Sequence, residues 1–515
     1  MKLAFIFTDH MMLQRHLPIR VFGEGDGHAL VRFCGRQAEA NSVDGQWLVT
    51  LPPMPEGGPH EMTVTLNGET MILRDILVGE IFLAGGQSNM EQPVFRTLGA
   101  RQYIETCEND RIRLFKVPHI WKKGYPVSSW TMEHATNLDT PWSPACRQVV
   151  PHFSAIGYYF ARELEKELDI PVGVIDCCEG GKVIETFIPY DEFHRHTCLK
   201  QPLAAYEAAL AQVNLEENEA VFEKFAEESF AYFSACDPQM FDDPMGMGVR
   251  LVLARETMAF ADNRYPNMPY YGPYSSSRPG CLWETMLMRI VPFAFRGVLW
   301  YQGESNGNDR NYKEKYKILM DCWRQAFQNP EMPFYACELA PHGNTTEDNS
   351  GWPFLREQQL QATREYTNNY LATTQELGDE FDIHPLEKDS LAHRLVLLAL
   401  KHTYGRESIT ADGPIYRSME VEGGNIRLRF DNVKSFIMRQ WPREFYIAGE
   451  DRVFYPAWAG LQGDTLLVGS DKVQSPVAVR YCFHQYHKGG NIYNEAGIPL
   501  HPFRTDDWDD VTTGG

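Results

Sequence analysis

The stretch EIFLAGG (80–86) is a short apolar run that closes on two glycines, and it sets the fold expected for the middle of the chain. Four later runs share this form, namely PVGVIDC (171–177), RGVLWYQG (296–303), PFYACELA (333–340) and NYLATTQELG (369–378). Short, continuously apolar runs are typical of parallel strands that are buried on both faces of a sheet. The five runs therefore predict a five-stranded parallel sheet.

Helical periodicity between these runs predicts the helices that a parallel sheet needs for its crossovers. One apolar series comprises Ile156, Tyr159, Phe160 and Leu164. A second series precedes the fourth run and comprises Tyr312, Tyr316, Leu319, Trp323 and Phe327. Alternating strands and helices build a doubly wound sheet with helices on both faces. The core is therefore expected to be an α/β domain over residues 79–410.

The two ends of the chain differ in texture from the middle. Short apolar runs separated by turn residues, at intervals of about 8–12 residues, are typical of antiparallel β domains. This texture predicts an N-terminal β domain over residues 1–78 and a C-terminal β-sandwich over residues 411–515. Residues from about 192 to 278 form an acidic helical run and a stretch rich in Pro and Tyr, and they are predicted to be an insertion in the α/β domain.

Charge and composition narrow the classes of partner. The 515 residues include 48 basic and 69 acidic side chains, which gives a net charge of −21, and 43% of the residues are hydrophobic. This composition provides for a packed core and excludes intrinsic disorder. Phosphate backbones are bound mainly by clustered Lys and Arg, so no nucleic-acid partner is expected.

Cysteine spacing indicates whether disulfides or a metal site are expected, and hydropathy indicates the cellular compartment of the protein. The eleven cysteines include no C-x-x-C pair and no spacing typical of a zinc site, so neither a disulfide framework, a metal nor another cofactor is expected. No run reaches the length of about 18 apolar residues that a membrane span needs. The N-terminal apolar run ends at Asp9 and His10, and no signal-peptide cleavage site follows. These features predict a cytoplasmic protein, or a secreted one if a leader has been removed.

Open α/β sheets bind ligands beyond the carboxyl ends of their strands, so the residues that follow the five runs are candidates for a site. In chain order they are Ser88, Gly180, Gly181, Gln302, Glu304, Ser305, Asn306, His342, Asp379, Asp382 and His384. Serine-based acyl transfer requires a hydroxyl nucleophile, an imidazole base, a carboxylate that orients the imidazole, and donors for an oxyanion. The sequence therefore predicts a serine hydrolase site at this edge of the sheet.

Two serines compete for the role of nucleophile. Ser305 lies in GESNG, which matches the G-x-S-x-G elbow but is equally consistent with a plain turn in which Ser305 or Asn306 caps a helix. Ser88 lies in GGQSNM, which matches the elbow less well. Of sixteen histidines, only His384 follows a predicted strand end with two aspartates within five residues upstream, and His342 is the weaker candidate for the base.

Several of these segments together resemble the sialate O-acetylesterase family, a group of SGNH-type carbohydrate esterases. The segments are GQSNME (86–91), CEGGKVIETF (178–187), VLWYQGESN (298–306), LREQQ (355–359) and DIHP (382–385). Outside the site, FTDHMMLQR (7–15) and NEAGIPLHPFRTDDW (494–508) resemble the opening and the close of that family. The resemblance covers essentially the whole chain and implies a flavodoxin-like SGNH hydrolase core with helices on both faces of its sheet.

The resemblance also implies roles for individual residues. In that family the serine of GQSNM attacks, which makes Ser88 the expected nucleophile, His384 the general base and Asp382 the orienting carboxylate. The expected oxyanion donors are the backbone N–H groups of Ser88 and Gly181 and the side chain of Gln302.

Two departures from the family pattern leave alternatives open. Other SGNH hydrolases place Asp three residues before His and an Asn in the third block, whereas this chain has D-x-H and QGESN. Asp379 is therefore an alternative to Asp382 as the triad acid. Asn306 or Glu304 is an alternative to Gln302 as the oxyanion donor.

A further group of residues is expected to order the site or to contact the substrate. Asn89 and Glu91 flank the nucleophile and are expected to hold it through hydrogen bonds to the backbone. Arg356 and Glu357 are expected to form a local ion pair near the site. Glu304 is expected either to act directly or to link loops by hydrogen bonds.

The resemblance implies an enzyme that hydrolyses O-acetyl esters on carbohydrates, with O-acetylated sialic acid as the first choice of substrate. The same machinery suits a deacetylase of xylan, mannan or another plant glycan. A carbohydrate-binding protein with a disused hydrolase core is the more distant alternative. A complete set of Ser, His and Asp argues against it, because a binding module needs no poised base.

Overall fold

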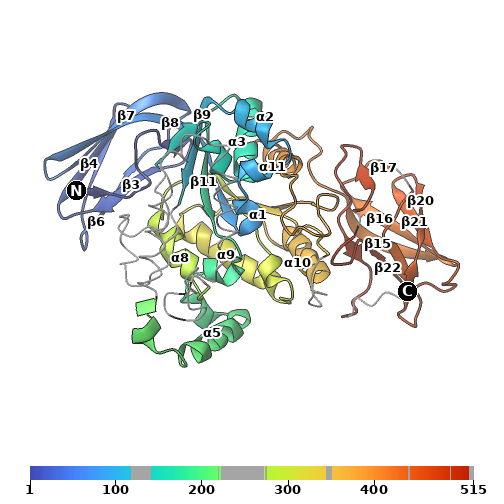
Figure 1. Cartoon of the computed structure of the whole chain (residues 1–515). Coiled ribbons are helices and arrows are strands. Elements are labelled where there is room, and N and C mark those ends of the chain that lie inside the picture. The colour runs from blue at the N-terminus through green and yellow to red at the C-terminus, as the bar shows by residue number, and fades with distance from the viewer. Residues whose placement is uncertain are drawn as a thin grey trace. The chain divides into compact units, whose positions relative to one another are not determined.

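The computed structural model, drawn in Figure 1, describes most of the chain. The described residues are 1–117, 141–218, 220–221, 272, 275, 277–343, 351–438, 441–487 and 489–509. They form two compact units, of which the first comprises Met1–Leu299 and Glu314–Met332 and the second Trp300–Lys313 and Pro333–Gly515. The larger part of the predicted insertion, from 222 to 271, lies outside the described residues.

The first unit is organised around one long strand, β8 (Glu69–Gly86). Its first part pairs antiparallel with β7 (Gly57–Leu66), and its last part pairs parallel with β11 (Val172–Cys178). On its other edge β11 pairs parallel with β9 (Asn109–Lys116), a strand that was not predicted. A short strand, β10 (Ser143–Ala145), pairs antiparallel with β9. Buried parallel strands thus lead to the carboxyl end of β8, as expected for the α/β part of the chain.

Some of the N-terminal strands, in blue in Figure 1, belong to the same sheet as β8, and the others form a sheet of their own. β2 (Met12–Gln14), β4 (His28–Phe33) and β5 (Arg36–Asn41) belong to the β8 sheet, whereas β1 (Lys2–Leu3), β3 (Ile19–Glu24) and β6 (Gln46–Leu51) form a separate one. Because β8 runs without a break through residue 78, the predicted end of the N-terminal β domain falls inside a strand.

The start of the main helix of the first unit is fixed to the turn after β8. The helix α3 (Ala155–Leu168) matches one predicted apolar series and packs on β11 and β9. The Ser154 Oγ caps it by accepting from the Gly157 N–H at 3.1 Å, and the same hydroxyl donates to the Met90 carbonyl at 2.7 Å. Met90 lies in α1 (Ser88–Glu91), so the cap of α3 also holds the helix that contains Ser88.

The described part of the first unit contains further helical segments, and most of them are short. The α-helical ones are α2 (Ala100–Glu105), α4 (Glu192–Arg195), α5 (Thr197–Leu210) and α8 (Cys281–Thr285). Single 3₁₀ turns occur at Val94–Arg96, Val150–His152, Ile184–Phe187 and Leu287–Arg289. The third predicted strand is β12 (Gly297–Tyr301), a neighbour of β8, and the second predicted helix is α9 (Tyr312–Ala326).

The second unit contains the last two predicted strands. β13 (Phe334–Cys337) and β14 (Asn369–Ala372) pair parallel in register. The helix α10 (Trp352–Glu365) packs on β14, and α11 (Asp389–His402) packs on both strands. All five predicted strands are therefore present, and the chain is of the mixed α/β class.

The rest of the second unit, in red in Figure 1, is a β-sandwich. One antiparallel sheet contains β15 (Ile415–Glu422), β16 (Asn425–Asp431), β21 (Thr465–Gly469) and β20 (Trp458–Gln462), and the other contains β19 (Phe454–Pro456), β18 (Phe445–Ala448), β22 (Ala478–Tyr481) and β24 (Phe503–Arg504). Two further strands, β17 (Phe436–Met438) and β23 (Ile492–Asn494), pair antiparallel with each other. Leu428 and Ile447, one from each sheet, belong to the same buried cluster. Among the helices of the described ranges, none is long and apolar enough to cross a membrane.

A buried carboxylate anchors β8 within the first unit. Glu80 has no exposed surface, and its side chain accepts hydrogen bonds from Gln14 at 3.0 Å, from Arg15 at 2.6 Å and from Arg296 at 2.8 Å. Burial acts to raise the pKa of Glu80, but the two arginines outweigh burial and hold the pKa below its ordinary value. Glu80 therefore joins the segment after β2, the middle of β8 and the segment before β12.

We predict that Glu80→Gln lowers the free energy of unfolding by about 3 kcal/mol, because it leaves two half-buried arginines without their counter-charge. Urea unfolding followed by tryptophan fluorescence measures the loss. Glu56 is the matched control, since it also pairs with Arg15, at 2.9 Å, but is exposed. Glu56→Gln is expected to cost less than about 1 kcal/mol. Equal losses in the two variants would contradict the anchoring role.

The same anchor has a defined pH dependence. A carboxylate whose pKa is lowered by folding contributes stability above its unfolded pKa, about 4.3, and loses that contribution as the pH falls below it. The stability difference between the wild type and Glu80→Gln is therefore expected to be constant near neutral pH and to narrow below about pH 4.

Candidate active site

Ser88 lies in a tight turn between a buried strand and a short helix. β8 ends at Gly86, whose φ of 134° favours glycine, and Gln87 then leads into α1. Ser88 is the first residue of α1 and is half-buried, whereas Gln87 and Asn89 on either side of it are buried. The turn thus places Ser88 at the carboxyl end of β8.

The glycine loop after β11 lies against this turn. A Cβ atom added to Gly180 would lie 3.4 Å from the Ser88 Cβ, which is ordinary contact distance. The Gly180 N–H donates to Glu91 Oε2 at 2.8 Å. Gly181 follows in the left-handed region, with a φ of 70°, and is exposed. The structure therefore brings Ser88 and the predicted glycine pair together, and Glu91 bonds the two segments.

A half-buried lysine lies beside Glu91. The Lys116 Nζ, at the end of β9, lies 3.7 Å from Glu91 Oε1 and 3.7 Å from Oδ2 of Asp176, a fully buried residue of β11. Burial acts to lower the pKa of Lys116, but the attraction of Asp176 and Glu91 outweighs it and raises the pKa to about 12. Lys116 is thus a permanent cation beside Glu91. The sequence reasoning missed it together with β9, and the run DRIRLFK (110–116) was the available signal.

In the second unit, the segment after β12 joins two amides that the sequence left as alternatives. Gln302 is fully buried, and its Nε2 donates to Asn306 Oδ1 at 2.6 Å. The Gln302 carbonyl accepts from the Tyr312 hydroxyl at 3.0 Å and from Gln359 Nε2 at 3.3 Å. Gln302 is therefore held on both sides and in turn orients Asn306.

Between these amides lie Glu304 and Ser305. Ser305 is the middle residue of a 3₁₀ turn (Glu304–Asn306) and is exposed, whereas Glu304 is half-buried. The buried Lys388 has its Nζ 5.5 Å from the centre of the Tyr301 ring. Burial lowers the pKa of Lys388 to about 7, and the attraction of Glu304 opposes that shift.

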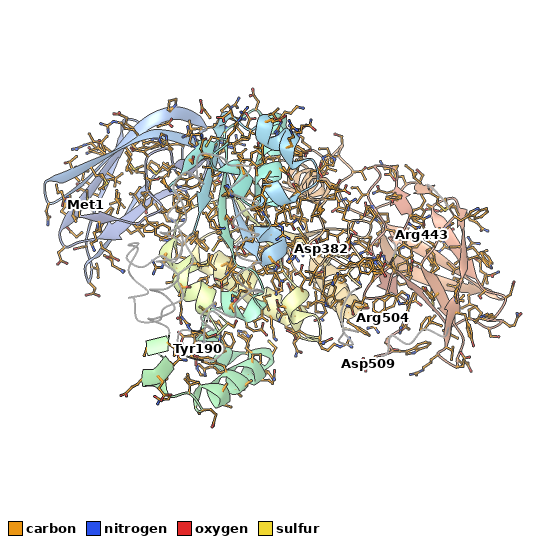
Figure 2. All side chains as sticks on the ribbon, viewed as in Figure 1. Met1, Tyr190, Asp382, Arg443, Arg504 and Asp509 are labelled. Carbon is orange, nitrogen blue, oxygen red and sulfur yellow. The ribbon has the colours of Figure 1, made fainter. Side chains whose placement is uncertain are left out.

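The two aspartates before His384 have different hydrogen-bond partners. Asp379 Oδ1 accepts from the Phe381 N–H at 2.8 Å and from the Asp382 N–H at 3.0 Å, and these bonds lower the pKa of Asp379. Asp382, labelled in Figure 2, accepts from the His384 N–H at 2.8 Å, and its Oδ1 lies 3.7 Å from His384 Nδ1. Asp379 therefore closes the turn, and Asp382 is the carboxylate beside the imidazole.

His342, the weaker candidate for the base, is bound to that same turn. It is 6% exposed, its Nδ1 lies 3.2 Å from the Asp379 carbonyl, and its ring is 5.9 Å from the ring of Trp352. These contacts suit a residue that supports the turn from inside. In the part of the chain that the structure describes, no group of three His, Cys, Asp or Glu residues could hold a metal ion.

Arg356 and Glu357 bind different partners, so the ion pair expected between them is wrong. Arg356 is fully buried; it donates to the carbonyls of His484 and Gln485 and, from Nη1, to His487 Nε2 at 3.1 Å. Glu357 binds Arg504, labelled in Figure 2, at 2.8 and 2.9 Å. Neighbouring residues of a helix point in different directions, so adjacency in LREQQ does not pair them.

Comparisons with known proteins indicate what the chain as a whole resembles. Residues 276–397 match the family described as carbohydrate esterase, sialic acid-specific acetylesterase. The chain is 26% identical over 475 residues to the sialate O-acetylesterase of Mus musculus, covering 84% of this chain and 79% of that one. It is 24% identical over 455 residues to the Homo sapiens protein of the same name, covering 81% and 74%.

A solved structure described as a novel carbohydrate acetylesterase from Xanthomonas citri is also similar. It is 28% identical, with a TM-score of 0.76, and the match covers 98% of this chain and 100% of that one. These matches support an esterase enzyme that is similar to carbohydrate esterases. Within that class, the resemblance to sialate O-acetylesterases that the motifs predicted is confirmed over most of the chain.

We predict that Glu91→Ala lowers kcat for an aryl acetate by about 10- to 100-fold with a smaller change in KM, because the Gly180–Gly181 loop loses its tie to the turn of Ser88. Steady-state kinetics measures both constants. Glu91→Gln keeps a side-chain oxygen that accepts from the Gly180 N–H, so it is expected to retain most of the activity. If Glu91→Ala stays within about two-fold of the wild type, the loop is held by other contacts.

Proposed function

We propose that the chain hydrolyses O-acetyl esters on carbohydrates through a Ser88 acyl-enzyme, with O-acetylated sialic acid as the first substrate. The observation that carries this proposal is the Ser88 turn, in which a half-buried serine and an adjacent glycine loop are held together by Glu91. The pairing of Asp382 with His384 supports it, because a serine hydrolase needs an oriented imidazole.

The proposed reaction has two steps. His384 takes the proton of the Ser88 hydroxyl while Ser88 Oγ attacks the acetyl carbonyl carbon. His384 then gives this proton to the departing sugar oxygen. Water then gives a proton to His384 and attacks the acetyl-serine, which releases acetate and returns the proton to Ser88 Oγ. Asp382 holds the imidazole tautomer that accepts the proton and stabilises the imidazolium.

Three donors are proposed for the tetrahedral oxyanion. The backbone N–H groups of Ser88 and Gly181 supply two, and the Gly181 group depends on the loop that Glu91 holds. The third is the side-chain amide of Gln302, acting with Asn306, to which it is hydrogen-bonded. The framework proposed for these groups is the flavodoxin-like SGNH core, in which ligands bind beyond the carboxyl ends of a five-stranded parallel sheet.

Ser88 is preferred to Ser305 on local geometry. Ser88 begins a helix directly after a long buried strand and has a glycine loop in contact with it. Ser305 lies inside a 3₁₀ turn in an exposed position, where water solvates a developing oxyanion and weakens the contribution of fixed donors. The G-x-S-x-G match of GESNG is therefore proposed to be a turn signal and not an elbow.

The solved relative from Xanthomonas citri is described only as a carbohydrate acetylesterase, which keeps a plant-glycan substrate as the second candidate. Acetate release from O-acetylated sialic acid and from acetylated xylan, measured side by side, decides between the two. If acetate is released faster from acetylated xylan, xylan becomes the preferred substrate, and the proposed mechanism is unchanged.

We predict that Ser88→Ala lowers kcat for an aryl acetate by at least about 10³-fold, because the covalent step is lost. Ser305→Ala is the matched control and is expected to retain activity close to that of the wild type. Full activity in Ser88→Ala, or a comparable loss in Ser305→Ala, would contradict the assignment of the nucleophile.

A further inference from the structure

We propose that the C-terminal β-sandwich supplies part of the substrate site, in which Tyr486 and Phe381 bind a neutral pyranose that adjoins the acetylated sugar. This inference rests on the proposed function and extends it to the neighbouring sugar unit. It follows from contacts inside the second unit between two parts of the chain. One is the segment formed by residues 484–487 and Gly489, which precedes β23, and the other is the turn that leads to His384.

Residues 484–487 of this segment are held from the interior of the unit. Arg356 on α10 donates to the carbonyls of His484 and Gln485 and to His487 Nε2. Burial, followed by the charge of Arg356, lowers the pKa of His487 well below its ordinary value, so His487 is neutral. Two carbonyls and one imidazole nitrogen thus surround one buried guanidinium, which fixes the position of residues 484–487.

The segment lies against the residues that lead to Asp382. A Cβ atom added to Gly489 would lie 3.1 Å from the Glu376 Cα. The His342 N–H donates to the Gln485 carbonyl at 3.4 Å. Arg443, labelled in Figure 2, donates to the Gly489 carbonyl at 3.0 Å and so ties the segment to the sandwich. The sandwich and the His384 turn are therefore joined by direct contacts.

Tyr486 lies beside Glu380 at this junction. The Gly343 N–H donates to the Glu380 carbonyl at 3.1 Å, and a Cβ atom added to Gly343 would lie 3.1 Å from Glu380 Cγ and 3.2 Å from Tyr486 Cγ. Tyr486 is half-buried, so part of its ring is open to solvent. A ring that is fixed at its base and open on its outer part is suited to contact with a ligand.

Phe381 follows Glu380 and precedes the triad carboxylate. Its side chain is 75% exposed, although its backbone is fixed by the hydrogen bond to Asp379. A single exposed phenylalanine is ordinary, but Phe381 follows directly on Glu380, the residue beside which Tyr486 lies. In the proposed subsite both aromatic residues contact the same sugar ring. The C–H groups of a pyranose pack on such rings.

The charges at this surface select a neutral sugar. Asp379 and Glu380 are exposed carboxylates next to the two rings, and both act on the hydroxyl of Tyr486. Carboxylates accept hydrogen bonds from sugar hydroxyls but repel an anionic ligand. The subsite therefore fits a neutral pyranose, and a sialate unit would bind away from it.

Kinetics on an acetylated oligosaccharide of neutral sugars, with an aryl acetate as the comparison substrate, tests the inference. Tyr486→Ala and Phe381→Ala are each expected to raise KM for the oligosaccharide by about three- to ten-fold with little change in kcat, and the change for the aryl acetate is expected to be smaller. Tyr486→Phe keeps the ring and is expected to restore the KM. Trp458→Ala, which removes a half-exposed ring from β20 of the same sandwich, is the matched control and is expected to match the wild type.

Two results would overturn the inference. One is an unchanged oligosaccharide KM in both Tyr486→Ala and Phe381→Ala, and the other is an equal loss on the aryl acetate, which would indicate damage to the catalytic turn. If the proposed function itself is wrong, the result is different. The wild type would then cleave the aryl acetate but release no acetate from any acetylated carbohydrate.

Discussion

The placement of Ser88 depends on how β8 is held, and the buried carboxylate of Glu80 is the contact that holds it. An ionised carboxylate without exposed surface is stable only when its oxygens are paired. Here Arg15 and Arg296 supply the charge and Gln14 a further donor. These partners come from segments far apart in the sequence, so one interaction fixes the strand whose end carries the proposed nucleophile.

Beyond the anchored strand, polar side chains around the site mainly hold backbone. Glu91 binds the Gly180 N–H, Asp379 binds two N–H groups of its own turn, and Arg356 binds two carbonyls of the C-terminal segment. Each uses a charged group for a main-chain partner, which gives strong and directional contacts. The distinctive motifs therefore encode loop geometry as much as chemistry, and this explains why flanking residues such as Glu91 accompany Ser88.

The sequence predicted the five strands and two principal helices because their apolar periodicity is local. It also placed the candidate residues at strand ends, and Ser88 with Gly180 is one pair that the structure brings together. Contacts between distant segments could not be predicted in this way. Lys116 was missed with its strand, and adjacency suggested a pair of Arg356 with Glu357, whereas each side chain reaches a partner more than a hundred residues away. Tertiary contacts of this kind leave no local pattern.

Covalent labelling by a serine-reactive fluorophosphonate, followed by mass spectrometry of the labelled peptide, tests whether Ser88 is the activated nucleophile. The reagent forms a stable adduct only with a serine that a base activates. We expect a single adduct, on Ser88 of the full chain. An adduct on Ser305, or no adduct in a preparation that hydrolyses aryl acetates, would contradict it.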